Sequence, residues 1–181
     1  VGVDLSERSV GTTAIGAALA EQQPVWLHRG EHFFDANGHY SCAGAPLWGP
    51  QGECVGMLDL TGVDVAERPA LKHLVTQSAR SIENALVLEQ PHALLLRLNW
   101  PGQHLGEDSD GLLCVDSDGF VVGRNRAASD MLAIAQDGLR LHCSDLFALP
   151  WEHLFDAARA RRPTVHILPS YSSVDFTVLG F

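Results

Sequence analysis

The sequence predicts an α+β protein built from two segments, each an antiparallel sheet with flanking helices. Short apolar runs lie on either side of tight turns, as the strands of hairpins do, and runs with helical periodicity lie between them. In the second segment two strands, short helices and further strands follow one another, unlike the alternation of a doubly wound parallel sheet. The 181 residues, of which 46% are hydrophobic, suffice for one ordinary domain or two small ones.

The first segment runs to about residue 88. Apolar residues recur at helical spacing over 11–21, where Thr12 or Thr13 can cap a helix. The later elements are a short strand over 24–28, a turn or short helix over 31–39, a hairpin of strands 40–48 and 54–62 around the turn 50–53, and a long helix over 67–89.

The long helix carries Pro69 in its first turn and presents two distinct faces. We expect its apolar stripe to cover the sheet, and this stripe consists of Leu71, Leu74, Val75, Ser78, Ile82, Leu86 and Val87. We expect its polar face to meet solvent, and this face includes Lys72, Gln77, Arg80, Ser81 and Glu83.

A connection over 89–110 follows, and Pro91 separates it from the helix. Its leucine-rich half is compatible with a strand or with an extension of the helix, and its second half reads as a polar loop. The second segment begins near Gly111. It contains a hairpin around the turn 116–119, a helix capped by Asn125, a turn capped by Ser144, a helix opened by Pro150, and strands over 164–168 and 174–181.

Charge and cysteine usage exclude several classes of protein. The formal net charge is −10, and so acidic a chain repels a phosphate backbone. No apolar run approaches the roughly 20 residues that a bilayer requires, and no signal-peptide pattern opens the chain, so we expect a cytoplasmic protein without membrane contact. The cysteines lack a C-x-x-C pair and indicate reduced thiols in apolar settings: Cys42, Cys54, Cys114 and Cys143.

The stretch GTTAIGAALAE over 11–21 superficially matches a phosphate-binding loop. Such a loop needs a lysine and then a hydroxyl after its last glycine, whereas Ala17 and Ala18 stand at those places. We therefore interpret Gly11, Gly16 and the alanines as packing residues, which allow the helix backbone to approach the sheet closely.

Four motifs occur together over residues 6–87: SERSVGTTAIGAALAE, EHF, CAGAPLWGPQGECVGMLDLTG and SARSIENALV. In their order and spacing they resemble the carboxy-terminal part of a GAF domain. The resemblance is closest to the GAF domain of acetoin-catabolism-type activators, which work with sigma-54 RNA polymerase. Thr13 and Ala17 stand where that family usually has Asn and Thr, so polar ligand contacts of those two positions are not carried over.

The motifs GLLCVDSDG and NRAA, together with the linker before them, are similar to the opening of the PAS domain that follows in such regulators. The resemblance implies the carboxy-terminal part of a GAF domain over 1–88, a linker over 89–110 and a truncated PAS domain over 111–181. Because the chain starts without Met and stops in a strand-like run, we expect a fragment. The ATPase and helix-turn-helix domains of these regulators are not recognisable in it.

The segment EHFFDANGHYSCAGAP over 31–46 is the candidate ligand-binding region. A short hydroxyketone or diol needs an apolar cavity with one or two directed polar groups. In GAF folds this region generally borders the ligand cavity, as the resemblance implies. We expect Glu31 to hold a backbone amide or a histidine in place. The candidate ligand contacts, which lie beside small residues, are His32, Phe33, Tyr40 and Cys42.

Other chemistry finds little support. His28 and His32 would share a helical face and could bind a metal, but a strand ending at His28 favours surface and turn histidines, and we predict no metal site. No nucleophile has a base or a second carboxylate that the sequence singles out, so we do not expect an enzyme.

The second segment offers two weaker motifs. The turn 116–119 is a hairpin turn rather than a calcium loop, because its glycine falls at the fourth place and Ala127 takes the place of the closing Glu. Cys114, Met131 and Trp151 could line a cofactor cavity, but we expect them to be core residues, and no cofactor is predicted.

These expectations converge on the signal-sensing region of a bacterial sigma-54-dependent transcriptional activator. Acetoin or a related polyol or ketone would bind in the GAF cavity and shift a two-state balance of connecting helices in a homodimer. DNA and sigma-54 RNA polymerase would be contacted only through domains outside these residues. Two alternatives stay open, a sensor module of a histidine kinase or cyclic-nucleotide enzyme and a dimerisation scaffold without ligand.

Overall fold

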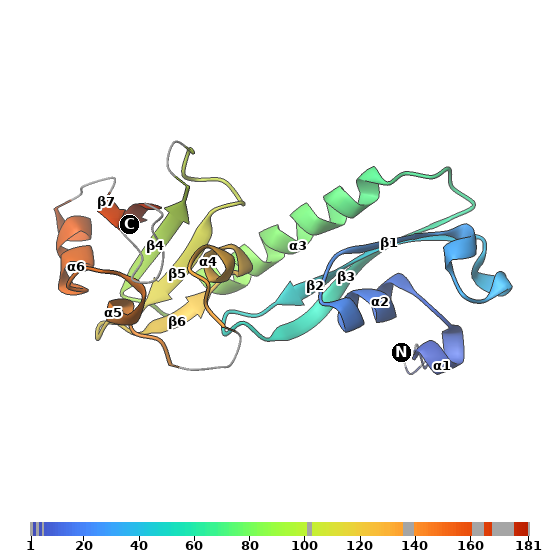
Figure 1. Cartoon of the computed structure of the whole chain (residues 1–181), viewed down its shortest axis with the longest axis horizontal. Coiled ribbons are helices and arrows are strands. Elements are labelled where there is room, and N and C mark those ends of the chain that lie inside the picture. The colour runs from blue at the N-terminus through green and yellow to red at the C-terminus, as the bar shows by residue number, and fades with distance from the viewer. Residues whose placement is uncertain are drawn as a thin grey trace. The chain divides into compact units, whose positions relative to one another are not determined.

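A computed structural model describes residues 2, 4, 6–100, 103–135 and 140–160, and the backbone of 165–167 and 176–180. The described residues form an α+β fold with two compact units (Figure 1). Unit 1 comprises Val1–Leu47 and Cys54–Ile82, and unit 2 comprises Trp48–Glu53 and Glu83–Phe181. Each unit has its own antiparallel sheet.

The sheet of unit 1 has three strands in the order β1-β2-β3: β1 (Val25–His28), β2 (Tyr40–Trp48) and β3 (Cys54–Val63). Strands β1 and β2 are antiparallel, with Val25 opposite Gly44 and His28 opposite Ser41. Strands β2 and β3 are also neighbours in the sheet, which confirms the predicted hairpin. Two 3-10 turns, η1 (Arg29–Glu31) and η2 (Asp35–Asn37), occupy the predicted irregular segment between β1 and β2.

Helices α2 (Ala14–Glu21) and α3 (Ala70–Leu88) cover opposite faces of this sheet (Figure 1). A short helix, α1 (Glu7–Val10), precedes α2. Thr13 caps α2, because its hydroxyl accepts a hydrogen bond from the Gly16 amide at 3.0 Å.

The close contact of α2 with the sheet depends on Gly44 rather than on Gly16. A Cβ atom added to Gly44 would lie 2.8 Å from the carbonyl oxygen of Ala14, whereas one added to Gly16 would meet only the Thr13 hydroxyl at 3.5 Å. The prediction was thus wrong for Gly16. Gly11 adopts a positive φ of 71°, which favours glycine, and a Cβ atom there would lie 2.8 Å from the Phe34 ring. Ala14 is buried.

Helix α3 packs on the other face through Leu71, Val75 and Ala79, which contact Ala43 and Ala45 of β2. The predicted stripe was wrong in part, because Leu74 is 49% exposed and Ile82 is 38% exposed. The buried residues of α3 follow one another at intervals of four, from Leu71 through Val75 to Ala79. Ala79 belongs to this row because its small side chain fits against the alanines of β2.

Glu83 continues this buried row although we expected it to face solvent. Its side chain is 4% exposed, and its carboxylate accepts a hydrogen bond from the Trp48 amide at 3.0 Å. The backbone donor satisfies this buried oxygen, because a polar group is tolerated in a protein interior where hydrogen bonds replace its water.

The sheet of unit 2 has five strands in the order β6-β5-β4-β8-β7. Their bounds are β4 (Leu94–Asn99), β5 (Gly111–Val115), β6 (Val121–Arg124), β7 (Val165–Ile167) and β8 (Phe176–Gly180). The leucine-rich half of the connection is thus the strand β4, in the centre of the sheet. Leu96 and Leu95 of β4 enter two different core clusters, so both faces of the strand are buried and the run is continuously apolar.

Three short helices belong to unit 2: α4 (Arg126–Met131), α5 (Cys143–Leu146) and α6 (Glu152–Arg159). The predicted cap of α4 is confirmed, since the Asn125 side chain accepts a hydrogen bond from the Ala128 amide at 2.8 Å. The predicted cap of α5 was wrong. His142 caps this helix instead, because its Nδ1 accepts a hydrogen bond from the Ser144 amide while its Nε2 lies 3.0 Å from the Asp118 carbonyl oxygen.

We predict that Gly44→Ala lowers the free energy of unfolding of unit 1 by about 1–3 kcal/mol, the usual cost of overpacking. The added methyl group would meet the backbone of Ala14, which cannot rotate away. Gly56→Ala in strand β3 is the matched control, because a Cβ atom at Gly56 has no neighbour within 4 Å. Urea unfolding of both variants measures the difference, and equal midpoints would contradict the prediction.

Candidate functional site

His32 is the most deeply buried of the predicted ligand contacts. It follows η1, and its side chain is 5% exposed. The ring Nδ1 lies 3.1 Å from the carbonyl oxygen of Thr12. The ring Nε2 is buried and has no hydrogen-bond partner among the described residues. A buried polar atom left in this way is unusual in a folded protein, and this property sets His32 apart from the other three candidate residues.

Hydrogen bonds at the end of strand β1 hold the turn that precedes His32. Glu31 accepts a hydrogen bond from the His28 amide at 2.6 Å, which confirms that Glu31 holds a backbone amide. The His28 ring is itself held by the Ser41 hydroxyl, 2.6 Å from Nδ1, in the neighbouring strand. His28 and His32 therefore have separate hydrogen-bond partners, the Ser41 hydroxyl and the Thr12 carbonyl. Their four-residue spacing in the sequence does not correspond to a shared partner.

The Thr12 carbonyl is held in place by its neighbours in the chain. Thr13 caps α2 next to it, and Gly11 adopts its positive φ just before it. The Asn37 side chain, from η2, donates a hydrogen bond to the Val10 carbonyl at 2.8 Å. The segment 10–13 is thus tied both to its own helix and to the loop that carries His32.

Cys42 lies in strand β2 and is also buried. The Thr61 hydroxyl of strand β3 lies 3.4 Å from its sulfur and 2.5 Å from the Asp59 carboxylate. Burial raises the pKa of the Cys42 thiol, and the nearby charge of Asp59 adds to the increase, although the Thr61 contact opposes it. Cys42 is therefore a neutral thiol at physiological pH and offers shape and a weak donor rather than a nucleophile.

The other two predicted contacts lie at the surface of unit 1. Phe33 is 74% exposed and packs edge-on against Phe34, and Tyr40 is 38% exposed. The structure thus separates the four candidates into two buried and two exposed side chains.

Sequence reasoning missed Thr12, which contributes only its backbone and so leaves no side-chain signal. It also missed Thr61. The two-residue spacing of Asp59 and Thr61 was an available signal, because it places both side chains on the same face of a strand.

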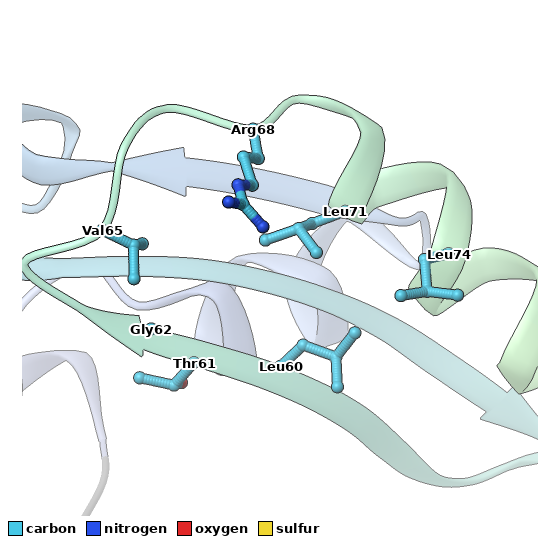
Figure 2. Close-up of a pocket in the computed structure, with 7 residues that line it drawn as sticks. All are labelled: Leu60, Thr61, Gly62, Val65, Arg68, Leu71 and Leu74. Atoms are coloured by element: carbon cyan, nitrogen blue, oxygen red, sulfur yellow. The ribbon is translucent and has the colours of Figure 1, made fainter.

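A hollow of unit 1 lies between the end of β3, the loop after it and the start of α3 (Figure 2). Its volume is about 350 Å³. Figure 2 shows the Arg68 side chain extending over the groove toward Leu71. The lining is mostly apolar, and its residues are Leu60, Thr61, Gly62, Val65, Arg68, Leu71 and Leu74.

A buried polar cluster organises unit 2 around Asn125. Its side-chain oxygen accepts hydrogen bonds from the Leu112 and Ala128 amides, and its nitrogen donates to the Asn84 side chain at 2.7 Å and to the Asp110 carbonyl at 2.8 Å. All the hydrogen-bonding positions of this amide are therefore used. The cluster holds helix α4, strand β5 and the last turns of α3 together.

Asp110 anchors the loop before strand β5. Its carboxylate is fully buried and forms an ion pair with Arg97 at 3.1 Å. The same carboxylate accepts hydrogen bonds from the Asn99 side chain at 2.9 Å and from the Gly106 amide at 2.6 Å. Because its partners all belong to the fold of this unit, we assign Asp110 a structural role.

The weaker motifs of unit 2 are structural too. Cys114 belongs to a core cluster and donates a hydrogen bond to the Val87 carbonyl, and Met131 and Trp151 pack against another core cluster. Their prediction as core residues is confirmed. Asp116 accepts hydrogen bonds from the amides of Asp118 and Phe120, which confirms the hairpin turn.

The described part of the chain contains neither a membrane-spanning helix nor a cluster of metal-ligating side chains. Its helices are too short or too polar to cross a bilayer. Within the same residues, no three His, Cys, Asp or Glu side chains gather closely enough to bind a metal ion.

Comparison with known proteins agrees with the motifs. Residues 1–86 match the GAF domain family. A signal-transduction and transcriptional-control protein of Clostridium beijerinckii is 30% identical over 162 residues, which are 87% of this chain and 25% of that protein.

Two relatives carry names that refer to acetoin. An acetoin catabolism regulatory protein of Cupriavidus necator is 31% identical over 73% of this chain and 20% of its own length. The acetoin dehydrogenase operon transcriptional activator AcoR of Bacillus subtilis is 26% identical over 62% of this chain and 19% of its own length. The chain thus spans a quarter or less of these relatives. The predicted resemblance to acetoin-catabolism-type regulators is confirmed.

We predict that the stability of unit 2 falls as the pH rises from about 9 to about 11, because folding suppresses the ionisation of two thiols. Burial raises the pKa of Cys114 from 9.0 to about 11. Burial, with the nearby charge of Asp116, raises the pKa of Cys143 from 9.0 to about 12. The unfolded chain releases these protons first, so alkali favours unfolding.

The measurement is the urea midpoint as a function of pH. The double variant C114A/C143A is expected to flatten the alkaline slope, whereas Cys54→Ala, which removes a partly exposed thiol, is expected to leave it unchanged. An unaltered slope in the double variant would contradict the prediction.

Proposed function

We propose that this chain, in which residues 1–86 form a GAF domain related to that of acetoin-catabolism regulators, is the signal-sensing region of a bacterial sigma-54-dependent transcriptional activator. A GAF domain in relatives that are named transcriptional activators supports a sensory role in regulation. We place the protein in the cytoplasm and assign it no enzymatic activity of its own. Contacts with DNA and with sigma-54 RNA polymerase are made through other domains of such regulators.

The effector in this proposal is acetoin or a related small hydroxyketone or diol, bound within the GAF domain. The observation that carries the proposal is the buried His32 ring, whose Nε2 has no partner among the described residues. A small-molecule site needs a few directed polar groups in apolar surroundings, and His32 is such a group. Cys42 would border the ligand, and Phe33 and Tyr40 would close over it from their exposed positions.

We propose a linker over 89–110 and a truncated PAS domain over 111–181. The support comes from the motifs GLLCVDSDG and NRAA, which form the strand β5 with its turn and the capped start of α4. The effector would act by binding one of two arrangements of the connecting helices more tightly than the other, because a ligand shifts an equilibrium only by its differential affinity.

We predict that acetoin or butanediol raises the melting temperature of unit 1 in a thermal-shift assay. A ligand at a hundred times its dissociation constant adds about 2.7 kcal/mol to the free energy of unfolding. His32→Ala is expected to abolish the shift. His39→Ala is the matched control, because His39 is exposed and pairs only with Asp64 among its described neighbours. The absence of a shift with any hydroxyketone, diol or ketone in the panel would contradict the proposed effector class.

We also propose a homodimer in which the exposed apolar residues of α3 contribute to the interface. Leu74 and Ile82 are exposed on this helix, and exposed apolar side chains along a helix are what a coiled-coil or bundle interface buries. Sedimentation velocity at micromolar concentration is expected to give twice the mass of the chain. Leu74→Glu is expected to give the monomer mass, and Gln77→Glu, at another exposed position of α3, is the control. A monomer mass for the unaltered chain would overturn the proposal.

A further inference from the structure

The contact with Thr12 fixes which nitrogen of the His32 ring must carry a hydrogen. A carbonyl oxygen can only accept a hydrogen bond, so the Nδ1 atom that lies 3.1 Å from it must carry the hydrogen. A neutral imidazole has one N–H group. The second nitrogen, Nε2, therefore presents a lone pair and acts as an acceptor.

The surroundings of Nε2 favour the form in which this nitrogen carries no hydrogen. The ring is 5% exposed, and no described group offers Nε2 an acceptor, so a hydrogen on it would be left without a partner. The neutral ring leaves a buried acceptor instead, which gains a hydrogen bond as soon as a donor reaches it.

We infer that the effector is recognised by a hydroxyl hydrogen that it donates to His32 Nε2. The inference rests on the proposed function and specifies its ligand: His32 selects diols and hydroxyketones over ketones and ethers of similar size. A carbonyl or ether oxygen at the same place would direct its lone pairs at the lone pair of Nε2. The binding site then discriminates against such compounds, as sites built to hydrogen-bond a substrate hydroxyl do.

The test compares four small compounds by isothermal titration calorimetry on the 181-residue chain. Acetoin and butanediol carry a hydroxyl hydrogen, whereas butanone and the methyl ether of acetoin do not. We expect the first pair to bind roughly 10- to 100-fold more tightly, the range that an unsatisfied buried acceptor implies. Equal affinity for the two pairs would overturn the inference while leaving the proposed function intact.

Two variants assign the preference to His32. His32→Phe keeps an aromatic ring without an acceptor, so it is expected to remove the preference. His32→Gln keeps a carbonyl oxygen that can accept a hydrogen bond, so it is expected to retain part of it. If His32→Phe weakened both pairs equally, the residue would serve shape alone and the inference would fail. Circular dichroism on each variant checks that it folds.

The nitrogen-15 chemical shifts of the His32 ring give a readout that needs no ligand. We expect Nδ1 to carry the hydrogen and Nε2 to carry none. A hydrogen on Nε2 would overturn the inference whatever binds. If none of the four compounds bound, the acetoin-like effector and the inference that specifies it would both be wrong.

Discussion

The contact between helix α2 and strand β2 is the constraint on which the site of unit 1 depends. The Ala14 carbonyl occupies the space that a side chain on Gly44 would need, so backbone packs directly on backbone. Because α2 begins at Ala14, the depth of this contact also fixes the Thr12 carbonyl, which orients the His32 ring. Two residues without functional groups thus decide the geometry of the polar group that the proposed effector meets.

Unit 2 is held together by a different principle. Gly111 again lies against a helical alanine, Ala128, but the surrounding elements are connected by buried polar groups. Asn125 satisfies donors and acceptors on three elements at once, and Asp110 does the same for the loop before β5. Buried networks of this kind specify one arrangement, since partial satisfaction costs more than an apolar core would.

Local signals in the sequence predicted much of the fold. The hairpins, the caps by Thr13 and Asn125, and the long helix follow from turn residues and periodicity within a few positions. The buried face of α3 could not be predicted in this way. Its position depends on the alanines of a distant strand, and the burial of Glu83 depends on the Trp48 amide. Likewise, a histidine buried against a backbone carbonyl looks the same in sequence as the exposed His39, and the exposure of Phe33 runs against its hydrophobicity.

The last turns of α3 have a property that its first turns lack. Val75 and Ala79 contact the sheet without directional bonds, so a small rotation about the helix axis changes their contacts gradually. Glu83 and Asn84 bind specific atoms, and a shift of one residue, about 100° of rotation, would strand those atoms in the interior. An intermediate orientation would also leave these atoms without their partners, so the two bonds hold the last turns of α3 at one rotation about the helix axis.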